Sequence, residues 1–221
     1  MSTSAIDIRR ADEQDIPNLV ESIISAEKSG TSKLSYSTLF TISEPELRAL
    51  LAEILAEDVI GQELCVSGFL IAAQQGRFAG AMCAWVEGAG LKSSSLLKGN
   101  VLAYFFGRDR IAAATKNLKL MDELSLPRTP GALQIESVHV DAGHRGMGVC
   151  AQLLGAHEVQ ARRTISNLSK VQVILSKTNS AALSAYTKWG FRITEERSTQ
   201  NLQVLDLLPS TSKILMERHL P

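Results

Sequence analysis

The sequence has few cysteines, few aromatic residues and no long hydrophobic run. Its three cysteines, Cys65, Cys83 and Cys150, lack Cys-x-x-Cys spacing, so neither a zinc site nor a disulfide framework is indicated. All three have apolar neighbours, which is typical of buried free thiols in a reducing compartment. No apolar run is long enough to span a bilayer, and the polar start Met1–Ala5 has no apolar signal core. We therefore expect a cytoplasmic protein.

The sequence also lacks an excess of either charge. It has 23 basic and 23 acidic residues, so broad attraction to nucleic acid or to a membrane surface is not indicated. No His, Cys, Asp or Glu cluster has metal-ligand spacing, so we expect no metal. The chain of 221 residues is 45% apolar and has no low-complexity linker. This favours one domain, residues 1–221, with an insertion at about 91–131.

The most informative stretch runs from Glu136 to Leu154. It begins as a strand in which Val138 and Val140 share one face, passes through a glycine-rich turn and continues as an amphipathic helix. Gly146 and Gly148 permit backbone angles that other residues avoid. The first amides of a helix have no internal partner and carry partial positive charge. The stretch therefore predicts a phosphate site, against the alternative of a plain connecting turn.

Two nucleotide motifs compete for this turn. Gly146–Ala151 fits the dinucleotide pattern G-x-G-x-x-A, which expects an acid at the end of the next strand. The next apolar strand, Val171–Leu175, is followed by Ser-Lys-Thr, so this acid is missing. A phosphate loop would need Gly-Lys-Ser/Thr after the turn, and this is missing too.

The same turn resembles the acetyl-coenzyme A motif of the GCN5-related N-acetyltransferase (GNAT) family, Val-x-Pro-x-x-Arg/Gln-x-x-Gly-x-Gly/Ala. Arg145 and Gly148 match, while Ala142 replaces the usual proline and Cys150 the final small residue. About 34 residues later, Asn179–Phe191 is similar to the family's second motif, Asn-x-x-Ala-x-x-x-Tyr-x-x-x-Gly-Phe, at every key position. The resemblance is specific in the last third of the chain and weak across the expected insertion.

The resemblance implies a mixed α/β fold of the α+β class. Its central sheet is mixed and mainly antiparallel, splays between two parallel strands and has helices on both faces. It also implies acetyl-CoA as cosubstrate and an amine acceptor, either a small molecule or a protein, with a homodimer possible. The sequence agrees locally. It predicts a first helix with apolar residues from Ile16 to Ile24, a helix capped by Ser43, a β-hairpin over 69–86 and a last strand at Ile214–Leu220.

The resemblance also assigns residues to the cosubstrate. Strand residues Val138, His139 and Val140 would pair with the pantetheine arm, and the backbone amides of the turn would bind the pyrophosphate. Asn179, Ala182 and Tyr186 would line the arm from the later helix. The turn residues in this set are Arg145, Gly146, Met147, Gly148, Val149 and Cys150. Arg145 could add charge or simply cover the turn.

Two residues are the catalytic candidates. The Tyr186 phenol would protonate the departing thiolate, because a phenol of pKa about 10 holds its proton at neutral pH. Glu136 would take the amine proton, since burial raises the pKa of a carboxylate and improves it as a base. Alternation places Glu136 on the same strand face as Val138 and places His139 on the opposite face. His139 is the alternative base if the acceptor enters there.

Other functions remain open at this stage. A non-catalytic acyl-CoA sensor would use the same turn, and a nucleotide-dependent oxidoreductase would use the dinucleotide match. The acceptor is not identified, and its pocket is expected from Ser25–Lys33 and Leu91–Gly131. Within the latter, Val101–Phe106 is expected to be a helix or strand that completes the core, or alternatively a pocket wall or dimer contact, and Lys116–Glu123 a short helix.

Overall fold

The computed structural model describes residues 5–90 and 92–221, so the first four residues and Leu91, with which the expected insertion begins, lie outside the described residues. The strands are β1 (Ile6–Arg10), β2 (Phe69–Gln74), β3 (Arg77–Val86), β4 (Leu133–Val140), β5 (Lys170–Ser176), β6 (Arg192–Ser198) and β7 (Ser212–His219). The α-helices are α1 (Ile16–Lys28), α2 (Ser35–Phe40), α3 (Glu44–Glu57), α4 (Ser94–Phe106), α5 (Arg108–Asp122), α6 (Val149–Thr164), α7 (Ser180–Lys188) and α8 (Val204–Leu207). Short 3₁₀ turns are η1 (Glu13–Asp15), η2 (Val66–Gly68) and η3 (Ala142–His144).

The strands form one mixed sheet in the order β1-β2-β3-β4-β5-β7-β6. Only β4 and β5 run parallel; the other neighbouring pairs are antiparallel. The parallel pair follows from the crossover helix α6 between them, as the sequence predicts. The predicted hairpin is confirmed as β2 and β3, which are joined at Gln75 and Gly76 with left-handed backbone angles. The predicted fold class is confirmed.

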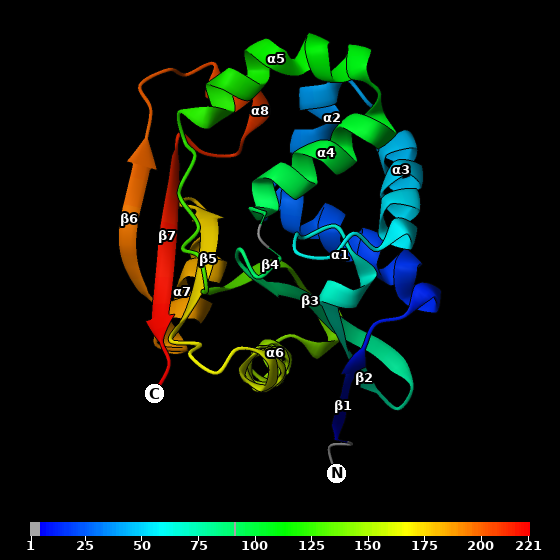
Figure 1. The fold of residues 1–221 in the computed structure, drawn as a ribbon, viewed down its shortest axis with the longest axis vertical. Helices are drawn as coiled ribbons and strands as arrows, with labels where there is room; N and C mark the ends of the chain where they lie inside the picture. The colour runs from blue at the N-terminus through cyan, green and yellow to red at the C-terminus, as the bar shows by residue number, and fades with distance from the viewer. Residues whose placement is uncertain (1–4, 91) are drawn as a thin grey trace.

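Helices cover both faces of this sheet, and each face has its own core. Helices α1 to α5 lie on one side of β3 and β4, and α6 lies on the other (Figure 1). Leu19, Ile23, Leu47 and Leu51 belong to the first core, together with β3 residues such as Trp85. The second core joins α6 and α7 to the inner strands. Because β3 is buried on both faces, residues 79–85 form a continuous apolar stretch instead of an alternating one.

The expected insertion consists of two helices and an extended segment. Val101, Leu102 and Phe106 of α4 pack into the first core, so the expectation of a core-completing helix at 101–106 is confirmed. The helix expected at Lys116–Glu123 is longer than predicted, because α5 begins directly after Gly107. Gly107 has φ +84°, an angle that suits glycine, and it separates α4 from α5.

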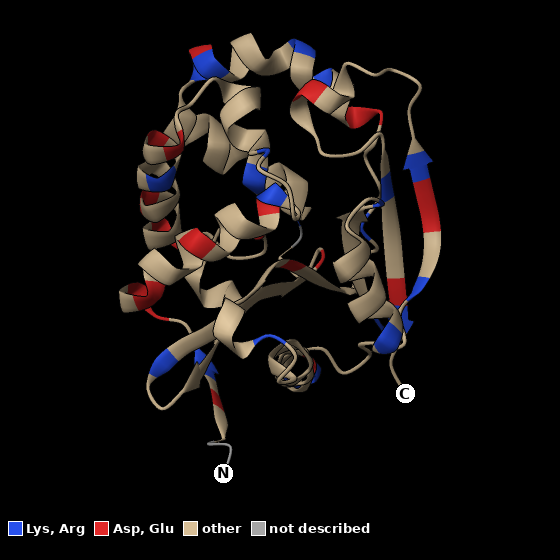
Figure 2. Cartoon of the chain, turned by 180° about the vertical axis from the view of Figure 1, so that it is seen from behind, with Lys and Arg blue, Asp and Glu red and all other residues tan. Residues whose placement is uncertain are grey.

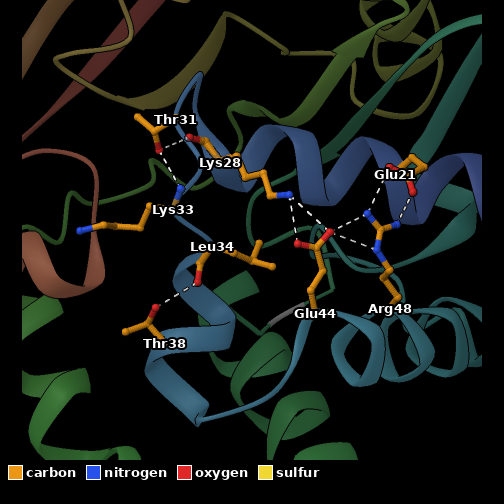
Figure 3. Close-up of polar contacts among 8 residues, drawn as sticks. All are labelled: Glu21, Lys28, Thr31, Lys33, Leu34, Thr38, Glu44 and Arg48. Carbon is orange, nitrogen blue, oxygen red and sulfur yellow. Dashed lines mark hydrogen bonds and ion pairs between the residues drawn. The ribbon is translucent and has the colours of Figure 1, made fainter.

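Ion pairs hold the end of α1 against the start of α3 (Figure 3). The Glu44 carboxylate accepts from Lys28 Nζ at 3.1 Å and from Arg48 Nη2 at 2.8 Å. Arg48 also pairs with Glu21, so one guanidinium joins both helices. As predicted, Ser43 caps α3, accepting from the Glu46 amide. Exposed pairs of this kind contribute little to the free energy of unfolding, so they orient helices that the apolar core holds together.

Charges of both signs share the same elements. Figure 2 shows acidic and basic residues together on α3 and on the edge strand β6, with no surface of a single sign along them. This agrees with the zero net charge of the sequence. In the part of the chain that the structure describes, no helix combines the length and the apolar character needed to cross a membrane.

Gly80 provides a test of how closely the sheet packs under α6. A Cβ at Gly80 would lie 2.6 Å from the His139 carbonyl oxygen and 3.1 Å from Val149 Cγ1. We expect Gly80→Ala to lower the free energy of unfolding by about 1–3 kcal/mol, because backbone atoms of β4 cannot move aside cheaply. Gly155→Ala is the matched control. Its Cβ would meet nothing within 4 Å, so the change should stabilise α6 by about 0.4–1 kcal/mol. Urea unfolding measures the free energy of unfolding of both variants. Equal changes in the two variants would contradict this packing around Gly80.

Candidate functional site

A bulge in β4 shapes the centre of the site. The register between β3 and β4 shifts between Ala81 and Cys83, and Ser137 has φ +49°. One extra residue in a strand reverses the face on which all later side chains lie. Cys83 pairs with Glu136 and Ala81 with His139, so both side chains lie on the α1 side of the sheet.

This bulge corrects two predictions from simple alternation. Glu136 does not share a face with Val138, because Val138 and Val140 pack against the second core, on the α6 side. His139 does not lie opposite Glu136, but on the same side of the sheet. Its ring stacks on Phe78, with the ring centroids 6.2 Å apart and the planes inclined by 15°. The prediction that Val138 and Val140 share a face is confirmed.

Strands β4 and β5 separate after a short stretch of pairing. Only Leu133, Gln134 and Ile135 pair with β5, opposite Val171, Gln172 and Val173. Beyond this point a cavity of about 350 Å³ opens between the strands. Ile135 to Val138 line it from β4, and Val173 to Ser176 line it from β5. The splayed sheet that the family resemblance implies is therefore present, with space between its strands.

Helix α7 forms one wall of this cavity, through Asn179, Ala182 and Tyr186. The Asn179 side chain caps the helix by accepting from the Ala182 amide at 3.2 Å. The Tyr186 ring is 5% exposed and is held edge-on between Trp189 and Phe191. Burial raises the pKa of the Tyr186 phenol well above its ordinary value, so the phenol keeps its proton across the physiological pH range.

The glycine turn leads from β4 into α6. Asp141 holds its start by accepting from the Gly143 amide at 3.0 Å and contacting His144 Nδ1 at 3.2 Å. Arg145 is exposed and donates from Nε to the Val140 carbonyl at 3.3 Å, so it covers the turn. Gly146 and Gly148 both have φ +78°, and Gly148 is the N-cap of α6.

This turn fits a phosphate group. A Cβ placed on Gly146 or Gly148 would meet no atom within 4 Å, so the space beside the backbone is open. The first amides of α6, a helix of 16 residues, point out of the helix without an internal partner. An anion there would accept from these amides and interact with the positive end of the helix.

The structure brings most of the predicted residues together around α7 and the turn. Cys150 is close enough to Tyr186 that the charge of its thiolate would raise the pKa of the phenol. Burial raises the pKa of Cys150 itself to about 11, so it remains a thiol. The side chain of His139 does not line the cavity, and Met147 is exposed in the turn. Among the described residues, no three His, Cys, Asp or Glu side chains are grouped so as to hold a metal ion.

The other end of the cavity is lined by charged residues that the sequence analysis did not single out. Arg128 donates from Nη2 to Glu136 Oε1 at 2.6 Å, and its guanidinium lies 5.2 Å from the centre of the Trp85 ring. Lys98 of α4 forms an ion pair with Glu63 and lies 5.3 Å from the centre of the Tyr36 ring. Glu27 of α1 and Lys213 of β7 complete this wall. Both segments expected to form the acceptor pocket, Ser25–Lys33 and the insertion, contribute residues.

Burial controls the protonation of these acids. It raises the pKa of Glu136, an effect that the nearby Glu63 carboxylate increases and the Arg128 contact only partly offsets. Burial also raises the pKa of Glu27. For Glu63, burial is again the largest effect and acts in the same direction, but the charges of Lys98 and Arg128 together with the hydrogen bonds to the carboxylate outweigh it and lower the pKa. Glu136 and Glu27 are therefore the cavity's better proton acceptors near neutral pH.

Arg128 is positioned by the residue that follows it. The Thr129 amide donates to Gln172 Oε1 at 2.8 Å, and Gln172 Nε2 donates to Thr129 Oγ1 at 2.8 Å. Gln172 also accepts from Gln134 and donates to Glu217. This buried amide network fastens the segment after α5 to β4, β5 and β7.

Weak signals for the missed residues were present in the sequence. Arg128 lies between Pro127 and Thr129-Pro130, and Glu63 directly precedes an apolar stretch that leads into β2. A charged residue beside a rigid or apolar segment has few ways to reach solvent, which favours a buried partner. The ion-pair partner of such a residue, however, can come from a distant part of the chain, and hydrophobic periodicity does not reveal which residue it is.

Ser137 provides a test of the bulge. Ser137→Val should lower the free energy of unfolding by about 1–2 kcal/mol, because a β-branched residue tolerates the left-handed backbone poorly. Ser137→Gly should remain within about 0.5 kcal/mol of the parent, since the relief of strain is offset by a more flexible unfolded chain. Chemical denaturation compares the two. A Val variant as stable as the Gly variant would show that the bulge is not maintained in solution.

Comparisons with known proteins agree with this geometry. The model of the acetyltransferase (GNAT) family matches residues 36–191. An N-acetyltransferase from Staphylococcus aureus Mu50 superposes with a TM-score of 0.65 at 14% identity, over 96% of this chain and 100% of that one. The structure of yncA from Salmonella typhimurium, solved with acetyl-CoA, superposes with a TM-score of 0.52 at 14% identity, over 98% of this chain and 95% of that one. The paia N-acetyltransferase from Thermoplasma acidophilum, solved with coenzyme A, superposes with a TM-score of 0.51 at 13% identity, over 98% of this chain and 99% of that one.

A comparison with curated protein sequences gave no significant match. At 13–14% identity, the solved structures support the fold alone. The family model is a separate line of evidence, because it covers most of the chain and includes both motifs and the splayed strands β4 and β5. On this evidence the chain belongs to the GNAT acetyltransferase family.

Proposed function

We propose that this protein transfers the acetyl group of acetyl-CoA to a primary amine by direct attack of the amine on the thioester. The observation that carries the proposal is the cavity at the point where β4 and β5 separate, with Tyr186 and Glu136 both on its wall. A cavity of this kind can take an extended chain between two strands and leave its reactive end beside an acid and a base. We propose further that residues 1–221 act as one domain with an insertion at about 91–131.

In this proposal, the donor binds along the splay. The amides of Arg145, Gly146, Met147, Gly148, Val149 and Cys150 would surround the pyrophosphate, where the backbone is open and the helix end is positive. The pantetheine arm would pair with the backbone of Val138, His139 and Val140. Asn179, Ala182 and Tyr186 would line the arm from α7. His139 would act only through its backbone, because its side chain is stacked on Phe78.

The chemistry needs a neutral amine, a stabilised oxyanion and a proton for the leaving thiolate. The amine nitrogen forms a bond to the acetyl carbon while the bond from that carbon to sulfur breaks. The departing thiolate takes the proton of the Tyr186 hydroxyl, and the nitrogen loses its extra proton to Glu136, directly or through water. Tyr186 then takes a proton from solvent and Glu136 releases one to solvent, which restores both side chains.

Arg128 affects how Glu136 serves as the base. Its hydrogen bond fixes one carboxylate oxygen, Oε1, and leaves the other to face the amine. Because burial raises the pKa of Glu136, the carboxylate is a stronger base than an exposed one. We place the reaction in the cytoplasm, since Cys65, Cys83 and Cys150 are free thiols.

The direct test of donor binding is calorimetry with acetyl-CoA and CoA. We expect binding of both, together with a rise in melting temperature, because a ligand that binds only the folded state stabilises it. Absence of acetyl-CoA binding would overturn the proposal. Binding without transfer to any amine would instead support the acyl-CoA sensor hypothesis.

Tyr186→Phe tests the proposed acid. We expect kcat to fall about 100-fold or more, because the thiolate then lacks a positioned proton donor, while the Kd for CoA changes little. Tyr104→Phe is the matched control, since Tyr104 is 79% exposed on α4. Steady-state release of CoA measures both variants. Equal turnover in the two variants would remove Tyr186 from the mechanism.

Glu136→Gln tests the proposed base through its pH profile. Activity needs the ionised carboxylate, so the parent's kcat/KM should fall as pH decreases through a pKa that burial has raised above 4.5. The Gln variant should lose this acidic limb and turn over about 100-fold more slowly at neutral pH. His139→Gln is the comparison for the alternative base. A preserved acidic limb in Glu136→Gln, lost in His139→Gln, would reverse the assignment.

A further inference from the structure

The charged residues around the cavity are balanced, and this bears on which amine is accepted. The acids are Glu27, Glu63 and Glu136, and the bases are Lys98, Arg128 and Lys213. Two acids and two bases are matched, as Lys98 with Glu63 and Arg128 with Glu136. The side chains of Glu27 and Lys213 form no ion pair or hydrogen bond with any residue that the structure describes. The wall thus offers one unmatched acid and one unmatched base.

The unmatched pair comes from two different elements, α1 and β7. Glu27 is near the end of α1, which the Lys28–Glu44 contact holds in place (Figure 3). Lys213 is opposite Ser176 at the edge of the splay, and the next residue, Ile214, packs on the other face of the sheet. Each influences the other's pKa through space without contact, and burial is the largest effect on both. Unpaired charges in such a place cost free energy until a ligand matches them.

One carboxylate oxygen of Glu63 also lacks a partner, in addition to the Glu27 and Lys213 side chains. The Glu63 side chain is 9% exposed, and its Oε2 is buried without a hydrogen bond, although Lys98 contacts Oε1. Glu63 lines the cavity, and a buried carboxylate oxygen that accepts no hydrogen bond costs free energy until a donor reaches it. An ammonium or amine group is such a donor, and Glu27 and Glu136 also line this cavity.

We propose that the acceptor is a small zwitterion, an amino acid or a close analogue, whose amine faces Glu27, Glu63 and Glu136 and whose carboxylate binds Lys213. This inference rests on the proposed acetyl transfer and adds the class of its acceptor. A polyamine would place a second ammonium against Lys213, which has no acid in contact with it. A simple amine would leave the half-buried Lys213 unmatched. Only a ligand with both charges matches the wall.

The experiment compares amino acids with the same molecules lacking the carboxylate. The pairs are L-methionine with 3-(methylthio)propylamine, L-phenylalanine with 2-phenylethylamine, L-histidine with histamine and L-lysine with cadaverine. Release of CoA and the mass of the product report transfer, and calorimetry on the CoA-bound protein reports binding. We expect at least one amino acid to exceed its decarboxylated partner at least 10-fold in kcat/KM. Equal or better use of the carboxylate-free amines or of spermidine, or no transfer to any amino acid although acetyl-CoA binds, would overturn the inference.

Variants then assign the carboxylate to Lys213. Lys213→Met should lower kcat/KM for the amino acid about 10- to 100-fold, through KM, and change that of the decarboxylated amine less than 3-fold. Lys213→Arg should recover most of the loss, and Glu27→Gln should weaken amino acid binding independently. Lys177→Met is the matched control, because Lys177 is exposed, pairs with Glu196 and does not line the cavity. An equal loss for both acceptors, or a changed Kd for CoA in Lys213→Met, would refute the assignment.

Failure of this inference is distinguishable from failure of acetyl transfer. If acetyl-CoA does not bind, the proposed function fails first. If acetyl-CoA binds and acetylates amines without regard to a carboxylate, the proposed function stands and the zwitterion inference fails. Loss of acetyl transfer in Tyr186→Phe together with retained amino acid binding would support both.

Discussion

The short parallel ladder between β4 and β5 is the constraint on which the rest of the site depends. It joins the two halves of the sheet at Leu133, Gln134 and Ile135 and then stops. A longer ladder would fill the gap with backbone hydrogen bonds and close it to any ligand. A shorter one would leave the halves joined by few contacts. The buried amide network of Gln134 and Gln172 strengthens the ladder at its closed end.

The bulge at Ser137 determines what lies on each side of the open end. It moves Glu136 and His139 onto the α1 face and leaves Val138 and Val140 on the face of α6 and α7. The carboxylate therefore enters a wall built from α1, α4 and the segment after α5, while the valines pack towards the coenzyme-binding side proposed above. A single residue in the left-handed region thus separates the proposed acceptor side from the proposed donor side.

The charges at the proposed acceptor side can be largely removed from solvent because most of them are paired. Arg128 is matched by Glu136 and supported by the Trp85 ring, and Lys98 is matched by Glu63 and the Tyr36 ring. Such pairs are weak evidence for stability, since desolvation offsets much of their attraction. Their value is geometric, because they fix the directions of carboxylate oxygens around the cavity. The acids and bases left unmatched are then the groups free to contact a ligand.

The sequence alone determined the local features of this protein. The glycine turn before α6, the Asn179 cap of α7, the Ser43 cap of α3 and the β2–β3 hairpin depend on residues close together in the chain, and spacing reveals them. Together with the family motifs, these residues were enough to predict the fold class and the splay.

Only the tertiary structure decided which charged groups share the cavity. Glu27, Glu63, Lys98, Arg128 and Lys213 come from five separate segments, and no periodicity connects them. It also decided the face of Glu136, because the period-two rule holds only while pairing is regular and one bulged residue reverses it. Local chemistry therefore predicted the donor side of the site, whereas long-range packing built the acceptor side, because its electrostatics arise between residues far apart in the chain.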